Sequence, residues 1–265
     1  MTSVFFPDTA SLDEPSALNR VPKVTIDFWL IKLMAVTMGE TAADYINVQL
    51  GIGLTNTSLI MTAVLIVALA AQFRQKRYVP WSYWLAVVLI SIVGTLVTDN
   101  LVDNFGVPLI VTAIGFTIAL VATFALWYSS ERTLSIHSIQ TTRREAWYWL
   151  AILFTFALGT AAGDLVAEKF GLGYLGTGIL FGMIIASLSV GYFFLGLDAI
   201  LGFWLVYILT RPLGASFGDL LSQDHKFGGL GLGTIITSAV FLGAIILIVA
   251  YMSYTHDGEE RAVEA

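Results

Sequence analysis

The sequence predicts an all-α membrane protein with eight transmembrane helices, arranged as four tandem helix hairpins. Composition is the first reason: the 265-residue chain is 57% hydrophobic and only 12% charged, and its mean hydropathy is +0.82. Apolar runs long enough to cross about 30 Å of hydrocarbon recur along it. The second reason is a repeated pattern of Trp-Leu, then Gly ten residues after the Trp, then Asp five residues after the Gly.

This pattern defines four repeats within two duplicated halves. Successive aspartates are 55, 65 and 55 residues apart, so the halves are offset by 120 residues. The equivalent residues are Trp29, Gly39 and Asp44; Trp84, Gly94 and Asp99; Trp149, Gly159 and Asp164; and Trp204, Gly214 and Asp219. Because all four repeats enter the membrane in the same direction, we expect pseudo-fourfold or pseudo-twofold symmetry about the membrane normal.

Apolar runs bounded by glycine-rich turns or polar loops locate the helices in order. The expected spans are 24–48, 57–73, 81–103, 107–128, 146–168, 173–194, 197–220 and 230–253. The first helix of each pair carries the Trp, Gly and Asp, and the second is more uniformly apolar. Glycines between them, such as Gly51 and Gly53, stop one helix and let the chain reverse.

These spans form one membrane domain, 24–253, with flanking tails. Its repeats are 24–75, 79–130, 144–196 and 199–253, and the two halves are joined by a linker over 131–143. Residues 1–23 are polar and lack a basic segment followed by an apolar core, so we expect a mobile cytoplasmic tail rather than a signal peptide. Residues 254–265 are expected to form a second cytoplasmic tail.

The distribution of Lys and Arg predicts that both termini are cytoplasmic. Basic residues gather on the side of the termini: Arg20, Lys23, Arg74, Lys76, Arg77, Arg132, Arg143, Arg144 and Arg261. The opposite turns hold only Lys169 and Lys226. Each repeated Trp then starts its helix near the inner interface, as an anchor or a packing residue. Each Asp lies roughly 22 Å further along, in the outer half of the membrane.

The repeated aspartates are candidate functional residues, because a carboxylate within an apolar span is costly. Residues four positions away share the Asp face of a helix. This adds Glu40 to Asp44, Thr95 and Asp103 to Asp99, and Thr160 and Glu168 to Asp164, and Thr37 lies on the same stripe as Glu40 and Asp44. Repeat four offers only Ala215 and Gln223 beside Asp219. Asp103 and Glu168 are expected at the outer mouth. Oxygen ligands of this kind suit Mg²⁺, Ca²⁺ or Mn²⁺, and also Na⁺ or protons.

The repeated glycines have a structural interpretation. Each starts a small-xxx-small pair: Gly39 and Ala43, Gly94 and Thr98, Gly159 and Gly163, and Gly214 and Gly218. Such pairs allow close helix packing in lipid. Their face is offset from the Asp face by roughly 100–140°, so each first helix can pack through Gly and direct its Asp inward. The aspartates themselves could also be architectural, capping helix ends or bonding hydroxyls on neighbouring helices.

Two basic residues lie inside spans. Lys32 is near enough to the inner edge for its amine to reach water. Arg211 is deeper, and an intramembrane Arg normally pairs with a carboxylate, so Glu40 or one of the aspartates is the expected partner. Pro212 follows it and removes a backbone hydrogen bond, which predicts a kink in the seventh span.

Several classes of protein are excluded by what the chain lacks. It has no cysteine, so it holds neither a disulfide nor a thiolate metal site. Its three histidines lie outside the spans, and it has no catalytic triad, phosphate loop or HExxH motif. We therefore do not expect an enzyme or a covalent cofactor. The net charge of −6 gives no sign of nucleic-acid binding.

The four hairpins resemble a family of bacterial integral membrane proteins built from four tandem two-helix repeats of unknown function. In that family each repeat carries a characteristic tryptophan, here Trp29, Trp84, Trp149 and Trp204, and the resemblance covers 24–253. Repeat four departs from the pattern at Ala215, at Arg211-Pro212 and in its longer turn. The resemblance implies the architecture and a bacterial inner membrane, and it implies no activity.

We therefore predict a membrane transporter of a cation. The preferred substrate is a divalent metal such as Mn²⁺, with proton coupling as an option, because crowded acids would release a proton when a metal binds. The expected ligands are Glu40, Asp44, Asp99, Asp164 and Asp219, supported by Thr37, Thr95, Thr160 and Arg211. The alternatives are a sensor that holds a lipid or small amphiphile and a structural partner subunit. The expected partners are the lipid bilayer, the cation and a second copy of the chain as a homo-oligomer.

Overall fold

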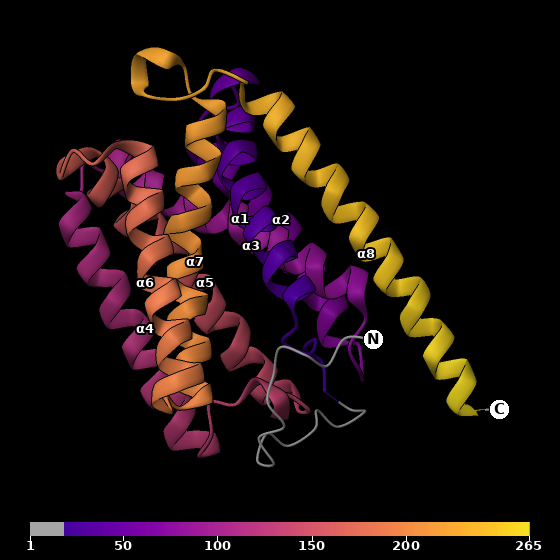
Figure 1. The fold of residues 1–265 in the computed structure, drawn as a ribbon. Helices are drawn as coiled ribbons and strands as arrows, with labels where there is room; N and C mark the ends of the chain where they lie inside the picture. Colours follow the sequence, from indigo (N-terminus) through magenta and orange to yellow (C-terminus); the bar gives the residue numbers. More distant parts are fainter. Residues whose placement is uncertain (1–18, 265) are drawn as a thin grey trace.

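The computed structural model describes residues 19–264, and within that range it contains eight α-helices and no strand (Figure 1). The helices are α1 Ile26–Asp44, α2 Leu54–Phe73, α3 Pro80–Asp99, α4 Leu109–Glu131, α5 Thr142–Asp164, α6 Gly173–Leu195, α7 Ala199–Ser222 and α8 Thr234–Glu264. They alternate in direction, so α1 begins and α8 ends at the same side of the bundle, as Figure 1 shows. The all-helical prediction is confirmed.

The four first helices form a closed inner ring. α1 packs against α3, α3 against α5, α5 against α7, and α7 against α1. The second helices lie outside this ring, and few of their residues are buried. The elements that carry the repeated Trp, Gly and Asp are therefore the buried ones.

Each outer helix packs on the first helix of the following repeat. α2 lies on α3, α4 on α5 and α6 on α7, and α8 completes the circle by packing on α1. The sequence predicts four tandem helix hairpins but not which helices pack on one another. Each second helix leans away from the first helix of its own repeat and covers the next one, because each inner helix is already flanked on two sides by its neighbours in the ring.

Seven of the described helices, α2 to α8, are long and apolar enough to cross a membrane. This indicates a multi-pass membrane protein. α1 is not among the seven: its 19 residues include four charged ones, Asp27, Lys32, Glu40 and Asp44. Eight spans were predicted, and all eight helices are present, but α1 lacks the composition of a lipid-exposed span. Because α1 is one of the four inner helices, its charged side chains can face neighbouring helices instead of lipid.

The repeated glycines mark the places where neighbouring inner helices touch. A Cβ atom added to Gly94 would lie 2.7 Å from Cβ of Phe156, and one added to Gly214 would lie 2.8 Å from Cβ of Val36. In the same way Gly39 faces Ser91 and Gly159 faces Arg211. Each glycine thus meets the residue three positions before the glycine of the next helix in the ring, so close approach requires glycine at all four crossings.

Aromatic side chains close one end of the ring. Each repeated Trp packs on the aromatic residue that precedes the Trp of the previous repeat, and the four pairs have ring centroids 5.4–6.2 Å apart. We call these eight residues the aromatic girdle: Phe28, Trp29, Tyr83, Trp84, Tyr148, Trp149, Phe203 and Trp204. Trp84, Trp149 and Trp204 are buried, so these indoles pack between helices instead of facing lipid head groups.

The chain segments at the girdle end are packed together. Asn19 donates to the carbonyl of Ile136 and accepts from the backbone N–H of Ile139, and Val21 is buried beside them. Of the tail expected over 1–23, residues 1–18 lie outside the described range, and 19–22 are held against the linker between the two halves. At the other terminus, α8 continues to Glu264, past the expected span end at 253.

A candidate cation site inside the helix ring

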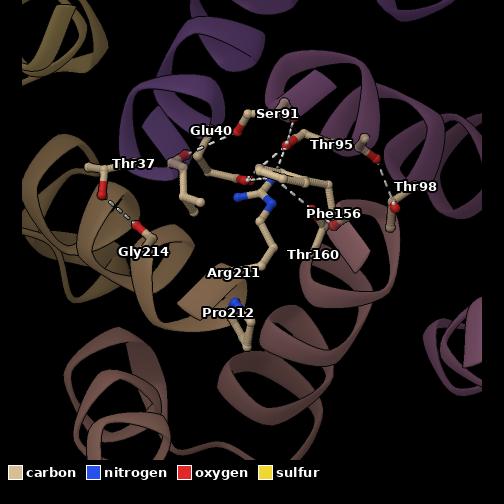
Figure 2. Close-up of polar contacts among 12 residues, drawn as sticks. Thr37, Glu40, Ser91, Thr95, Thr98, Phe156, Thr160, Arg211, Pro212 and Gly214 are labelled. Carbon is tan, nitrogen blue, oxygen red and sulfur yellow. Dashed lines mark hydrogen bonds and ion pairs between the residues drawn. The ribbon is translucent and has the colours of Figure 1, made fainter. Parts of the chain in front are cut away.

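Arg211 lies at the centre of a buried layer formed by three inner helices (Figure 2). Its Nη2 atom lies 2.9 Å from Oε2 of Glu40 on α1 and donates to Oγ1 of Thr160 on α5 at 2.9 Å. It also donates to Oγ1 of Thr95 on α3, which in turn donates to Glu40 at 3.0 Å. We call Glu40, Thr95, Thr160 and Arg211 the Arg–Glu layer.

The repeat pattern explains why these side chains meet. Glu40, Thr95 and Thr160 each follow the repeated glycine of their helix, so they occupy equivalent positions around the ring. Ala215 holds that position in α7 and leaves room, which Arg211 fills from the preceding turn. Glu40 is thus the acid that pairs with Arg211, and both side chains are buried, 8% and 1% exposed.

The four repeated aspartates lie one helical turn, about 6 Å, beyond the Arg–Glu layer. We call Asp44, Asp99, Asp164 and Asp219 the Asp layer. All four are partly buried, and each is close enough to Glu40 for their charges to interact. Asp44 accepts a hydrogen bond from Nε2 of Gln223 at 3.1 Å. Among the side chains that the structure describes, those of residues 19–255, no three acidic or histidine groups lie close enough together to hold a metal ion.

A π-helical turn follows three of these aspartates. α1, α3 and α5 end at Asp44, Asp99 and Asp164, and each continues as five π-helical residues: η1 Tyr45–Gln49, η2 Asn100–Asn104 and η4 Leu165–Lys169. Such turns are rare and occur frequently at functional sites. In repeat four, α7 continues as an α-helix to Ser222. No residue type recurs across the three turns in a way that could have indicated them from the sequence.

The other expected site residues lie at two different depths. Asp103 and Glu168 are exposed within the π-helical turns, at the end of the ring away from the aromatic girdle. Thr37 lies on the side of the Asp layer opposite to Asp103 and Glu168, and its hydroxyl donates to the carbonyl of Gly214 at 3.0 Å. It therefore joins α1 to α7 and does not reach the aspartates.

Lys32 lies in the interior of the ring, which the sequence did not indicate. The expectation that its amine reaches water is wrong. The side chain is fully buried. Its Nζ donates to the carbonyl of Tyr207 at 2.7 Å and to Oγ1 of Thr210, and it lies 3.8 Å from the centroid of the Tyr207 ring. In the sequence, Lys32 lies near the start of a helix. Only the closed ring of helices shows that its face of α1 packs against α7.

The fold and site together define a class: a multi-pass helical membrane protein whose four repeats surround a buried, charged centre. The chain belongs to the family described as Repeat of Unknown Function (DUF347), whose model matches four times, over residues 28–78, 82–133, 147–196 and 202–257. This confirms the resemblance seen in the sequence. No curated protein and no solved structure matches the chain.

Proposed function

We propose that this protein carries a cation across a membrane by way of the Asp layer. One observation supports this most: four equivalent, partly buried aspartates surround the end of a closed helix ring, one turn from the buried Glu40. Packing alone gives no reason to repeat a carboxylate at this depth in every repeat, because the glycines already make the helix crossings.

The spacing of the acids favours a cation that keeps part of its hydration shell. Since no three described acids lie close enough to bind a bare ion, water would bridge some aspartates to it, as is usual for Mg²⁺-like ions. A divalent metal such as Mn²⁺ is our preferred substrate, and exchange against protons would keep the number of buried charges constant.

The surroundings of the Asp layer support one orientation. We propose that the protein lies in a bacterial inner membrane with both termini cytoplasmic, following the distribution of Lys and Arg. Asp103 and Glu168 then surround the outer mouth and attract cations into it. In this orientation the packed aromatic girdle lies at the cytoplasmic end of the ring and the Asp layer lies toward the outside.

The test is uptake of Mn²⁺ into proteoliposomes loaded with a metal-sensitive dye. We expect Mn²⁺ uptake by the wild-type protein. For the double variant Asp44→Asn/Asp164→Asn, we expect no uptake above the leak of protein-free liposomes. Asp224→Asn is the matched control, because it removes an exposed carboxylate outside the bundle. Equal uptake by all three proteins, or none by the wild type for any cation, would contradict the proposal and favour a lipid-binding or structural role.

A further inference from the structure

The hydrogen bonding of Arg211 is strongly one-sided. All of its partners bind Nη2, whereas Nε and Nη1 are buried and have no hydrogen-bond partner within residues 19–264. A guanidinium offers five N–H donors, and leaving buried donors unpaired is costly. Arg211 is therefore anchored at a single nitrogen, and the rest of its donors are available for other acceptors.

The helix ring does not need an arginine at this position. The equivalent residues are Val36, Ser91 and Phe156, and each packs against a repeated glycine as Arg211 does. In α7 the Cβ and Cγ atoms of Arg211 make that contact with Gly159. The guanidinium extends beyond the crossing, so it adds a charge that the packing does not require.

The surroundings of the guanidinium differ between its two sides along the ring. Toward the aromatic girdle, its Cζ lies 5.4 Å from the ring centroid of Phe156, and the amine of Lys32 lies 5.6 Å from the same centroid. The Phe156 ring and the buried Lys32 amine therefore occupy the space on that side. On the other side lie the carboxylates of the Asp layer, one helical turn beyond the Arg–Glu layer, and Asp164 and Asp219 are near enough for their charges to act on Arg211.

The backbone beside Arg211 is also weakened. Pro212 lies inside α7 and has no N–H to donate to the carbonyl four residues earlier. α7 is the only helix in the described part of the chain with a proline beyond its first turn. A small bend at this point would carry the Arg211 side chain toward or away from the Asp layer.

We propose that Arg211 is an internal competitor for the cation that the Asp layer binds. Its guanidinium holds Glu40 while a cation occupies the Asp layer, and its movement toward Asp164 and Asp219 displaces that cation. This inference rests on the proposed function, and it assigns to one residue the step that releases the substrate. It also explains why one repeat of four has arginine where the other three have valine, serine and phenylalanine.

The test is Mn²⁺ binding to the purified full-length protein in detergent, measured from the loss of the free-ion EPR signal. Arg211→Gln should bind Mn²⁺ at least about tenfold more tightly than wild type, since a unit charge one turn away acts on a divalent ion across an effective dielectric of about 20. Its release rate after addition of a chelator should fall by a similar factor. Arg211→Lys keeps the charge and should stay within about threefold of wild type.

A second comparison protects the test against misfolding. Removing Arg211 alone leaves Glu40 buried without its partner, so we also compare Glu40→Gln/Arg211→Gln with Glu40→Gln, and the double variant should bind more tightly. If wild type binds Mn²⁺ and neither arginine substitution tightens binding, the competitor role is refuted and the cation site stands. If neither wild type nor any variant binds a cation, the proposed function fails and this inference fails with it.

Discussion

Substituting Gly94 with alanine tests whether the ring is held by close helix crossings. An added Cβ would lie 2.7 Å from Cβ of Phe156 and 3.2 Å from the backbone nitrogen of Ala157, where ordinary contacts begin at 3.4 Å. α3 and α5 would therefore have to separate by about 0.7 Å. Overpacking of this kind costs about 1–3 kcal/mol, and it exceeds the gain of up to about 1 kcal/mol from replacing glycine in a helix.

Two other glycines supply a graded control. A Cβ at Gly163 would lie 3.5 Å from Pro212, an ordinary contact, and one at Gly115 in α4 would meet nothing within 4 Å. We expect Gly94→Ala to lower Tm by roughly 2–6 °C, Gly163→Ala to change it little and Gly115→Ala to leave or raise it. Intrinsic fluorescence during thermal unfolding in detergent measures all three. If Gly94→Ala is as stable as Gly115→Ala, close approach at the glycines does not hold the ring together.

Two further substitutions test the buried charges. Among the described residues, Lys32 contacts a carbonyl, a hydroxyl and an aromatic ring but no carboxylate. Lys32→Met should therefore change the free energy of unfolding by less than about 1 kcal/mol, or raise it. A loss above about 2 kcal/mol, measured by thermal unfolding, would show that the amine stabilises the ring. Glu145 is buried and accepts from Arg20 at 2.6 Å, from Gln72 at 3.0 Å and from Trp149, so Glu145→Gln should cost about 1–3 kcal/mol and speed tryptic cleavage after Arg20. Unchanged cleavage would mean that another contact holds the segment before α1.

The repeat pattern predicted the inner helices because local spacing determines them. Gly39, Gly94, Gly159 and Gly214 were expected to pack helices, and each lies at a helix crossing. The stripe of residues four positions apart placed Glu40 next to Asp44 and Thr95 next to Asp99. These relations follow from the geometry of a single helix, which a sequence contains directly.

Relations between helices were harder to obtain. The sequence indicated hairpins, but it gave no sign that each second helix would cover the next repeat. Lys32 was expected to reach water because burial depends on which neighbour faces it, and that neighbour, Tyr207, is 175 residues away. The π-helical turns after Asp44, Asp99 and Asp164 have an aliphatic residue in common at their second position, but such residues are equally common in the α-helices, so hydropathy and spacing could not show these turns.

The order in which outer helices cover inner ones has a consequence for biosynthesis. The two helices of a repeat do not pack mainly on each other. Instead α2 packs on α3, α4 on α5 and α6 on α7, so each outer helix gains its main partner only after the next inner helix has been synthesised. The helix that covers α1 is α8, the last to leave the ribosome. α1 carries four charged residues, as many as α5, so a helix that is not apolar enough to cross a membrane on its own is the first to be inserted and the last to be enclosed. A nascent chain therefore holds Glu40 and Lys32 in an unfinished bundle until translation ends, and a chain truncated before α8 would leave one side of α1 open to lipid.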